Sequence, residues 1–380
     1  MNKDTAKSVI RNLLCHFHQI KHDRFYHLVM RKNGISDKKM PGEDEWLKKW
    51  SQFGIKAKTT QYRVFSHYIG EDINIVPEDI CHDFIEPLLD PFRFTGYYSD
   101  KNIYDKLFPE GFFPKTLLRR MNGFYYDKEY HPMQMSERLV TTLLRTLPSR
   151  KAILKPSIDG MSGKGIFMIE LTPAGRTKIT SANGQKLASD PKDIGRLFKG
   201  DFIMQEAVEQ NDYLMQFNPS SVNTLRLSVY RSVKDNSCHV TGAVLRIGGL
   251  GSVVDNAHSG GGYVGIQEDG RFCHAVLDQY GVKTTVFNGI DFSQDFSYPN
   301  WEEVTEFGKQ VCQFVPHHRL LALDIVLDIA GKPHLIEFNV LYYGLWVFQY
   351  TTGPAFGKFT DEIIDYCVEH KKDLEYLLWV

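Results

Sequence analysis

Hydrophobic residues in the N-terminal part of the chain recur with the period of an α-helix. In the first 30 residues they return every three or four positions, at Val9, Leu13, Leu14, Phe17 and Ile20. This spacing predicts one long helix, and a second helix is predicted over residues 43–53. Residues 60–98 are rich in aromatic side chains and contain prolines that break regular structure. We therefore expect a helical or irregular region that packs on a larger body.

From residue 151 onward the pattern changes to short apolar runs that are typical of strands. These runs cover residues 152–156, 166–171, 178–180, 184–188 and 201–205. A glycine-rich stretch separates the first two runs, and a helix is predicted at residues 191–198. Because the runs follow one another closely, we expect a compact antiparallel unit.

The C-terminal half continues with longer strand patterns. Strands are predicted at residues 225–233, 239–247, 271–276, 320–328 and 334–339, and helices at residues 301–313 and 360–370. A short turn at residues 329–332 joins the last two strands, so we expect them to form a hairpin. The whole pattern predicts an α+β protein with mostly antiparallel sheets.

Composition and charge narrow the class of protein. The 380 residues are 42% hydrophobic and 24% charged, which is ordinary for a globular protein. The length favours two or three packed subdomains. A net charge of −1 gives no overall attraction to nucleic acid or to an anionic membrane. Local pairs of cations such as Arg119-Arg120 are expected to lie on a solvated face.

Cysteines and targeting signals point to a reducing compartment. The six cysteines, at positions 15, 81, 238, 273, 312 and 367, form no C-x-x-C pair. Their wide spacing argues against a disulfide framework or a zinc ribbon. The first residues contain no apolar run long enough for a signal peptide, and no window is long and apolar enough for a membrane span. We expect a cytoplasmic protein without a transmembrane segment.

A lysine and a glycine-rich stretch form the first candidate site. Lys155 ends an apolar strand, where its ammonium group can reach phosphate oxygens. Main-chain N–H groups of the stretch that follows can approach the same oxygens; its candidate residues are Ser157, Gly160, Ser162, Gly163, Lys164 and Gly165. The stretch is not a Walker P-loop, because no Ser or Thr follows Lys164. The alternative is a flexible hairpin without a ligand.

Two carboxylates and an amide form a candidate metal site. Glu337 and Asn339 are two residues apart on a predicted strand, so both point to one face. Asp324 lies on the preceding strand, and hairpin pairing would bring it beside them. Oxygen ligands of these types suit Mg²⁺. The alternative is a set of polar residues on half-exposed strands.

A third segment could bind the nucleotide base and sugar. Residues 202–208 form an apolar strand that runs into an extended linker, which can offer main-chain groups to an adenine edge. Asp212 follows and can accept hydrogen bonds from ribose hydroxyls. The alternative is a buried strand followed by a surface turn.

In this order, the three segments resemble the ATP-grasp superfamily. Asp324 and Glu337 are 13 residues apart, as in its D…E-x-N signature, and Asn339 completes the signature. Lys155 matches the central phosphate-binding lysine, and Lys101 in Ser99-Asp100-Lys101 matches the second nucleotide lysine. The resemblance covers roughly residues 95–345. It implies that Gln205, Glu206 and Val208 form the adenine hinge and that Asp212 binds ribose.

The resemblance also implies a domain organisation. It gives two α+β lobes that clasp ATP, preceded by a helical N-terminal region at residues 1–95. The first part of the ATP-grasp fold would cover residues 96–208, including a small lobe at about 116–208. A C-terminal lobe with the Mg²⁺ site would cover residues 209–380.

Further motifs look like the sugar-transfer-associated ATP-grasp family. They are residues 62–68 (YRVFSHY), 69–72 (IGED), 220–226 (SSVNTLR), 245–248 (LRIG) and 255–256 with Gly260–Gly262. Proteins of that family are linked with surface-polysaccharide biosynthesis. Arg226 and Arg246, in two of these motifs, are the candidate catalytic residues, because an arginine near the γ-phosphate can neutralise developing charge. The alternative for each is an ion pair with a nearby carboxylate.

The function implied is an ATP-dependent, ADP-forming ligase. It would activate a carboxylate as an acylphosphate and join it to an amine or hydroxyl, with a small-molecule or sugar-linked substrate. Two features depart from many amide-forming relatives: Ala322 occupies the position of an arginine, and the aromatic segment 342–346 replaces a Pro- and Gly-bearing loop. The alternatives are a kinase that phosphorylates a sugar hydroxyl directly, and a non-catalytic nucleotide-binding subunit of a glycan assembly system.

Overall fold

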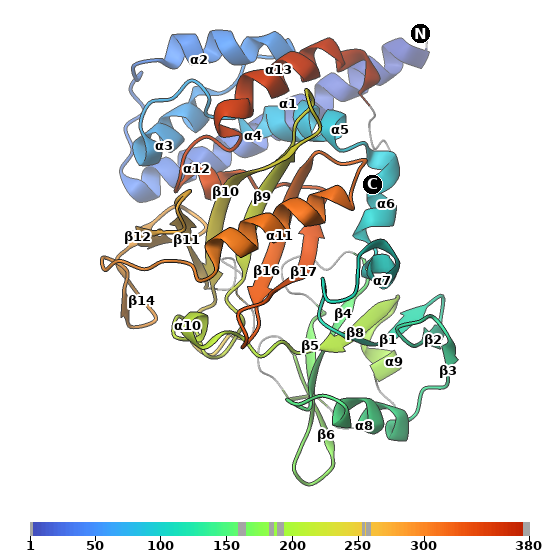
Figure 1. Cartoon of the computed structure of the whole chain (residues 1–380). Coiled ribbons are helices and arrows are strands. Elements are labelled where there is room, and N and C mark those ends of the chain that lie inside the picture. The colour runs from blue at the N-terminus through green and yellow to red at the C-terminus, as the bar shows by residue number, and fades with distance from the viewer. Residues whose placement is uncertain are drawn as a thin grey trace.

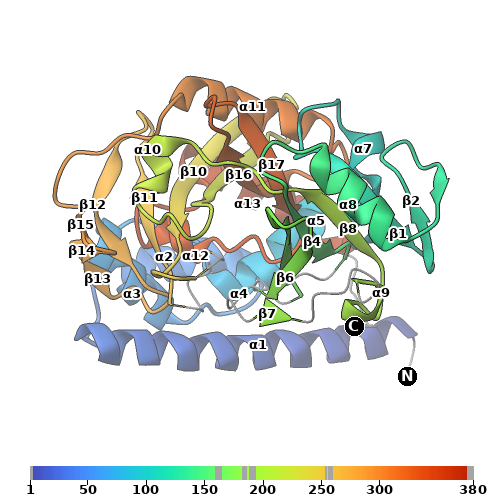
Figure 2. The same ribbon diagram turned by 90° about the horizontal axis from the view of Figure 1, so that it is seen from below.

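The N-terminal region is helical, as the sequence predicts. The computed structural model describes residues 3–158, 165–181, 186–187, 194–252, 255 and 260–374. The helices are α1 Lys3–Asn33, α2 Glu43–Trp50, α3 Thr59–Ile69, α4 Glu78–Ile80, α5 Glu86–Leu89 and α6 Phe92–Ser99. A 3₁₀ turn, Ser51–Phe53, follows α2, and a π-helical turn, Cys81–Ile85, links α4 to α5. In Figure 2, α1 runs the whole length of one side of the molecule.

The C-terminal helices return to this N-terminal region. They are α12 Trp346–Gln349 and α13 Thr360–Glu369, and an ion pair between Lys49 and Asp361 joins α13 to α2 (Figure 1). One hydrophobic core joins the two ends of the chain and includes the buried side chains of Trp46, Phe65 and Phe348. It also includes Leu320 and Ala322 of the large sheet, so the N-terminal region packs directly on that sheet.

A small lobe follows residue 99. The short helical segments Lys101–Ile103 and α7 Tyr104–Leu107 lead into an eight-stranded sheet with the order β3-β2-β1-β8-β4-β5-β6-β7. The strands are β1 Thr116–Met121, β2 Phe124–Tyr126, β3 Pro132–Met133, β4 Lys151–Pro156, β5 Phe167–Leu171, β6 Thr177–Ser181, β7 Lys186–Leu187 and β8 Phe202–Glu206. Two helices, α8 Glu137–Arg145 and α9 Ile194–Leu197, accompany it. The buried apolar face of α8, with Val140 and Leu144, packs into the core of this lobe.

The large sheet has seven strands in the order β13-β12-β11-β10-β9-β16-β17. Its strands are β9 Leu225–Arg231, β10 Cys238–Ile247, β11 Gly262–Ile266, β12 Phe272–Leu277, β13 Lys283–Thr284, β16 Leu320–Leu327 and β17 Pro333–Asn339. A small hairpin of β14 Val286–Phe287 and β15 Ile290–Asp291, and the helices α10 Asp212–Met215 and α11 Trp301–Gln313, complete the lobe. All of these strand pairs are antiparallel, which confirms the predicted α+β class.

Strand β16 is covered on both faces, which explains its unbroken apolar sequence. All eight of its residues are buried. Leu321 and Leu323 face the core under α11, whereas Leu320 and Ala322 face the N-terminal helices. Because successive side chains alternate, Asp324 follows Ala322 on the face toward the N-terminal region. A carboxylate in such a buried strand needs strong partners.

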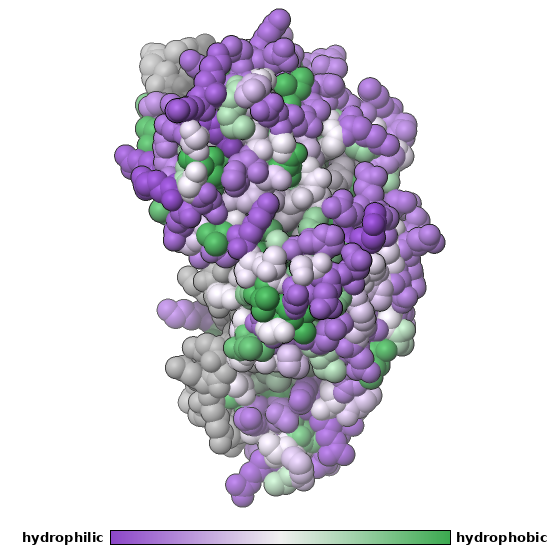
Figure 3. All heavy atoms as spheres, turned by 90° about the vertical axis from the view of Figure 1, so that its left-hand side faces the viewer, coloured by the Kyte–Doolittle hydropathy of each residue, from purple (hydrophilic) through white to green (hydrophobic). Residues whose placement is uncertain are grey.

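The surface is ordinary for a globular protein. On the face shown in Figure 3, hydrophilic residues predominate and hydrophobic residues occur in small separate groups. No helix among the described residues is long and apolar enough to cross a membrane.

Candidate active site

Strand register places the predicted metal residues side by side. Asp324 of β16 lies opposite Glu337 of β17, and Asn339 lies opposite Ala322. On its other side, Asp324 lies opposite Arg226 of β9. Directly opposite residues of an antiparallel pair share a face with their Cβ atoms about 5 Å apart. The hairpin that the sequence predicts is therefore confirmed, and it brings Asp324 between Arg226 and Glu337.

Two arginines hold the Asp324 carboxylate. Arg226 donates from Nε to Oδ1 at 2.6 Å and from Nη2 to Oδ2 at 2.9 Å. Arg246 donates from Nη1 to Oδ2 of Asp324 at 3.2 Å and from Nη2 to Oδ1 of Asp255 at 3.0 Å. Burial alone would raise the pKa of Asp324, but the attraction of Arg226 and Arg246 outweighs it and lowers that pKa. Both candidate catalytic arginines thus form the ion pairs that the sequence left open as their alternative.

Two lysines from the small lobe face the same carboxylates. Lys101 Nζ lies 3.3 Å from Glu337 Oε2, and Lys155 Nζ donates to the main-chain oxygen of Ile336 at 3.0 Å. Both lysines are buried. Burial, followed by repulsion from Lys101, lowers the pKa of Lys155 to about 8. The site therefore lies between the end of β4 and the middle of β17.

The start of the predicted nucleotide loop is fixed against Lys101. The main-chain oxygen of Ser157 accepts from Lys101 N at 2.9 Å, and Ser157 N donates to Asp201 O at 3.1 Å. Gly165 has a φ of +75°, which a glycine adopts without strain. Gly160, Ser162, Gly163 and Lys164 lie outside the described residues.

The predicted adenine hinge spans the end of β8 and the residues after it. The side-chain amide of Gln205 donates to Pro114 O at 3.2 Å, and Glu206 Oε1 accepts from Lys115 N at 2.9 Å. Val208 is half-buried, and Asp212 is exposed at the first turn of α10. The structure therefore places Gln205 in the core of the small lobe, with Glu206 at its edge.

Positive charge exceeds negative charge at this site. The cations are Lys101, Lys155, Arg226 and Arg246, and the carboxylates that pair with them are Asp255, Asp324 and Glu337. Two buried ammonium groups that repel each other are stabilised by an anion between them. The arrangement thus suits a polyphosphate.

The comparison with protein families agrees with this geometry. A family model described as sugar-transfer associated ATP-grasp matches residues 86–363. The chain belongs to this sugar-transfer associated ATP-grasp family. No curated protein matches the sequence significantly.

Several solved structures are similar to this ATP-grasp protein. For the ATP-grasp ligase PsnB, in a complex with Mg and ADP, the identity is 14% and the TM-score 0.37, over 73% of this chain and 61% of that chain. For the D-cycloserine synthetase DcsG the identity is 12% and the TM-score 0.37, over 74% of this chain and 73% of that chain. For the D-alanine-D-alanine ligase of Coxiella burnetii the identity is 8% and the TM-score 0.39, over 73% of this chain and 59% of that chain. The chain thus spans less than two thirds of two of these three proteins.

The donor set of this ATP-grasp protein also fits a magnesium ion. Carboxylate and amide oxygens are hard ligands, which Mg²⁺ prefers, and register brings all three residues to neighbouring positions of one hairpin. Glu337 keeps 27% of its side chain exposed, so one carboxylate remains accessible beside the lysines. Asn339 donates its side-chain N–H to Ala322 O at 3.1 Å, which fixes the orientation of its amide.

Sequence reasoning missed two residues that brace the site. Asp255 entered the sequence interpretation only as part of a family motif, without a partner, yet it pairs with Arg246 and accepts from Thr224 N at 3.1 Å. The prediction of a solvated face at Arg119-Arg120 was wrong for Arg119, which is fully buried. Its guanidinium binds Asp105 and the main-chain oxygen of Asn102, next to Lys101. Arg119 is buried because it binds residues of the helical segments that precede β1. The sequence around Arg119 does not show this contact.

The aromatic segment after Asn339 divides between core and surface. Tyr343 is buried, and its main-chain N–H donates to Glu86 Oε1 at 2.8 Å. Tyr342 is 68% exposed, and the edge of its ring meets His82 with 5.7 Å between the ring centroids. One tyrosine therefore anchors the segment and the other faces solvent beside the N-terminal region.

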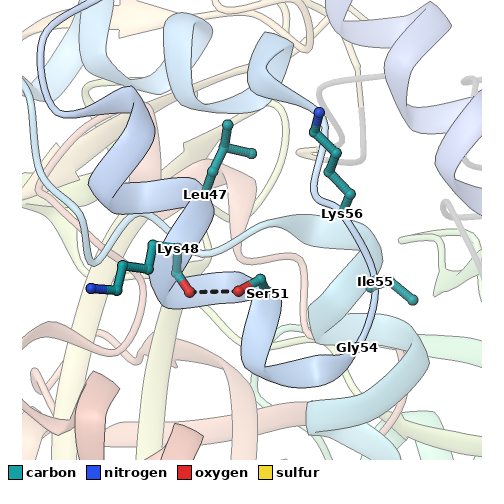
Figure 4. Close-up of a pocket in the computed structure, with 6 residues that line it drawn as sticks. All are labelled: Leu47, Lys48, Ser51, Gly54, Ile55 and Lys56. Atoms are coloured by element: carbon teal, nitrogen blue, oxygen red, sulfur yellow. Dashed lines mark hydrogen bonds between the residues drawn. The ribbon is translucent and has the colours of Figure 1, made fainter.

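A separate surface pocket lies on the N-terminal region. Figure 4 shows this pocket of about 520 Å³, which is lined by Leu47, Lys48, Ser51, Gly54, Ile55 and Lys56. Ser51 Oγ donates to Lys48 O at 2.7 Å and closes the turn at one side of it. Its lining comes from α2 and the segment after it, so it is distinct from the site on β16 and β17.

Proposed function

We propose that this ATP-grasp protein is an ADP-forming ligase that acts on a sugar-linked substrate. It would activate a carboxylate as an acylphosphate and join it to an amine or a hydroxyl. The observation that carries the proposal is the pair of buried lysines, Lys101 and Lys155, against the carboxylates of β16 and β17. Such a pair suits the β- and γ-phosphates of ATP better than it suits a neutral ligand.

Each side of the site would hold one part of the nucleotide. Lys101 and Lys155 would bind phosphate oxygens, together with the loop from Ser157 to Gly165. Main-chain groups of residues 205–208 would receive the adenine edge, and Asp212 the ribose. Asp324, Glu337 and Asn339 would hold Mg²⁺, which when bound neutralises phosphate charge and orients it for transfer.

The chemistry then needs two steps. A substrate carboxylate oxygen attacks the γ-phosphorus, the bond to the bridging oxygen breaks, and ADP leaves. An amine or hydroxyl next attacks the acyl carbon, and phosphate leaves with the electron pair. Arg226 and Arg246 are held 2.6 to 3.2 Å from the Asp324 carboxylate. From there we expect them to stabilise the charge that develops on the transferred phosphoryl group and on the tetrahedral oxyanion.

The exposed ring of Tyr342 supports a sugar as one of the substrates. It lies three residues beyond Asn339 and keeps an apolar face in solvent. A flat aromatic face that is otherwise unpacked is suited to stacking on the apolar side of a sugar ring. His82, which pairs with the buried carboxylates of Glu78 and Glu86, lies beside this ring.

Hydroxylamine trapping tests the proposal against direct phosphorylation. The protein is incubated with Mg-ATP, hydroxylamine and a panel of amino acids and uronic-acid sugars, and products are read by mass spectrometry. A ligase gives a hydroxamate and ADP. A phosphorylated sugar without a hydroxamate would support the kinase alternative. ATP binding without ADP release, with every candidate substrate, would support a non-catalytic nucleotide-binding subunit. Lys309→Ala on the surface of α11 serves as a control variant and should behave as the wild type.

A further inference from the structure

Arg231 is a buried cation without a carboxylate partner. It ends β9 and is 5% exposed. Its Nη2 donates to the main-chain oxygen of Cys312, and within the described residues its Nε has no hydrogen-bond partner. No carboxylate of the described residues forms an ion pair with it. A buried charge is normally paired, so the surroundings of Arg231 should contain another anion.

Two thiols lie at this arginine. Cys238, the first residue of β10, is directly opposite Arg231 in the β9–β10 pair, so the two side chains share one face. Cys312 lies near the end of α11, and its main-chain oxygen receives the guanidinium. Cys238 packs against the core cluster that contains Cys312, and each thiol has the largest influence on the pKa of the other. Cys238 is partly exposed and Cys312 is buried.

We propose that Cys238 and Cys312 form a redox-active dithiol, in which Cys238 is the reactive thiolate, Arg231 its counter-ion and Cys312 the resolving thiol. The substrate class is a small peroxide that reaches the partly exposed sulfur of Cys238. The inference stands on β9, β10 and α11 and does not depend on the ligase activity proposed above.

Electrostatics assign the two roles. The neighbouring Cys312 thiol, followed by the charge of Arg231, lowers the pKa of Cys238 to about 7. The neighbouring Cys238 thiol and burial raise the pKa of Cys312, to which the nearby Asp90 adds repulsion. Cys273 is partly exposed like Cys238 and serves as a comparison. Desolvation of its thiol raises the pKa of Cys273. Since the thiolate is the nucleophile, Cys238 should react first and Cys273 much more slowly.

The reaction balances with peroxide as the oxidant. The Cys238 thiolate attacks one oxygen of hydrogen peroxide, the O–O bond breaks, and hydroxide leaves to give a sulfenic acid. The Cys312 sulfur then attacks the Cys238 sulfur, the S–O bond breaks, and water leaves with the Cys312 proton. The protein loses two hydrogen atoms, and the peroxide becomes two molecules of water. A thiol reductant reverses the reaction, as expected for the transient disulfides of reducing compartments.

Mass spectrometry of the full-length protein tests this assignment. The reduced protein is treated with equimolar hydrogen peroxide, quenched with iodoacetamide and mapped without reduction. We expect a loss of two hydrogen atoms and a peptide that links Cys238 to Cys312. In Cys312→Ser, the reaction should stop at a Cys238 sulfenic acid that dimedone captures. Cys273→Ser is the matched control and should form the linked peptide as the wild type does.

A second measurement separates the role of Arg231 from a purely structural one. The rate of alkylation of each cysteine by iodoacetamide is followed from pH 6 to 10 by peptide mass spectrometry. Cys238 should titrate with a midpoint of about 7, and the midpoint should rise in Arg231→Met, whose folding is checked by circular dichroism. A Cys238 midpoint equal to or above that of Cys273 would overturn the proposal. So would peroxide that leaves Cys238 unmodified, or a disulfide that forms elsewhere.

Discussion

Lys155 should make the affinity for ATP depend on pH. Its pKa is lowered to about 8 because the ammonium group is buried and lies near Lys101. A bound phosphate would favour the charged form and return this pKa toward about 10.4, the ordinary value for lysine. ATP binding is therefore coupled to proton uptake. The affinity is full below the pKa of the free protein and falls as the pH rises through it.

The size of the effect follows from these two pKa values. In the free protein, the charged fraction of Lys155 falls from about nine tenths at pH 7 to about one tenth at pH 9, while in the complex it stays near one. The affinity should therefore fall about ten-fold, or about 1.4 kcal/mol, over this interval. At pH 8, binding should take up about half a proton for each nucleotide bound.

Isothermal titration calorimetry measures both quantities. ATP is titrated at saturating Mg²⁺ at pH 7, 8 and 9, in two buffers that differ in ionisation enthalpy. In Lys155→Arg the guanidinium stays charged at every pH used, so both the slope and the proton uptake should disappear. An affinity that is equal at pH 7 and pH 9 in the wild type would refute the reasoning. The same slope in Lys155→Arg would assign the titration to another group.

Three further substitutions, and Gly96→Ala as a control, test the ion-pair network, the packing of α11 and the substrate contact. Asp324→Asn removes the buried carboxylate between two partly buried guanidinium groups and should lower the free energy of unfolding by about 3 kcal/mol, the low end for breaking a buried pair; an unchanged Tm would contradict the ion-pair network. Gly308→Ala puts a Cβ atom 2.4 Å from Leu227 Cδ2 and should cost about 1–3 kcal/mol in denaturant unfolding. Gly96→Ala, whose Cβ meets nothing within 4 Å, should be neutral or stabilising; equal effects of the two would disprove the close packing of α11 on β9. Tyr342→Ala should raise KM for the sugar-linked substrate and leave the Kd for ATP unchanged, whereas loss of ATP affinity would argue for a structural role of that ring.

Local patterns in the sequence predict most of the elements that hold the site. The helix at residues 301–313 and the strand pair around residues 324 and 337 have an unbroken periodicity, and the structure has both. The Asp324–Glu337 pairing was predictable because one hairpin joins the two strands. The placement of Arg226 was not, since it lies 98 residues before Asp324 and depends on β9 packing beside β16.

Crowding between elements explains one of the strands that the sequence patterns miss. Residues 262–266 carry two glycines and are not among the predicted strands, yet they form the buried strand β11. A Cβ at Gly262 would lie 2.4 Å from Val276, and one at Gly265 would lie 2.5 Å from Thr351. These glycines therefore reflect close approach of neighbouring chains rather than freedom of the backbone.

The central claim is that Mg-ATP reacts at the site of Lys155 and Glu337. Its most direct test is the rate of ADP formation, followed by mass spectrometry with the substrate pool, in the wild type, Lys155→Ala and Glu337→Gln. We predict ADP rather than AMP in the wild type, and at least about a hundred-fold lower turnover in each folded variant, the scale of losing one electrostatic contact in the transition state. Near-normal ATP consumption in either variant, or release of AMP by the wild type, would contradict the account.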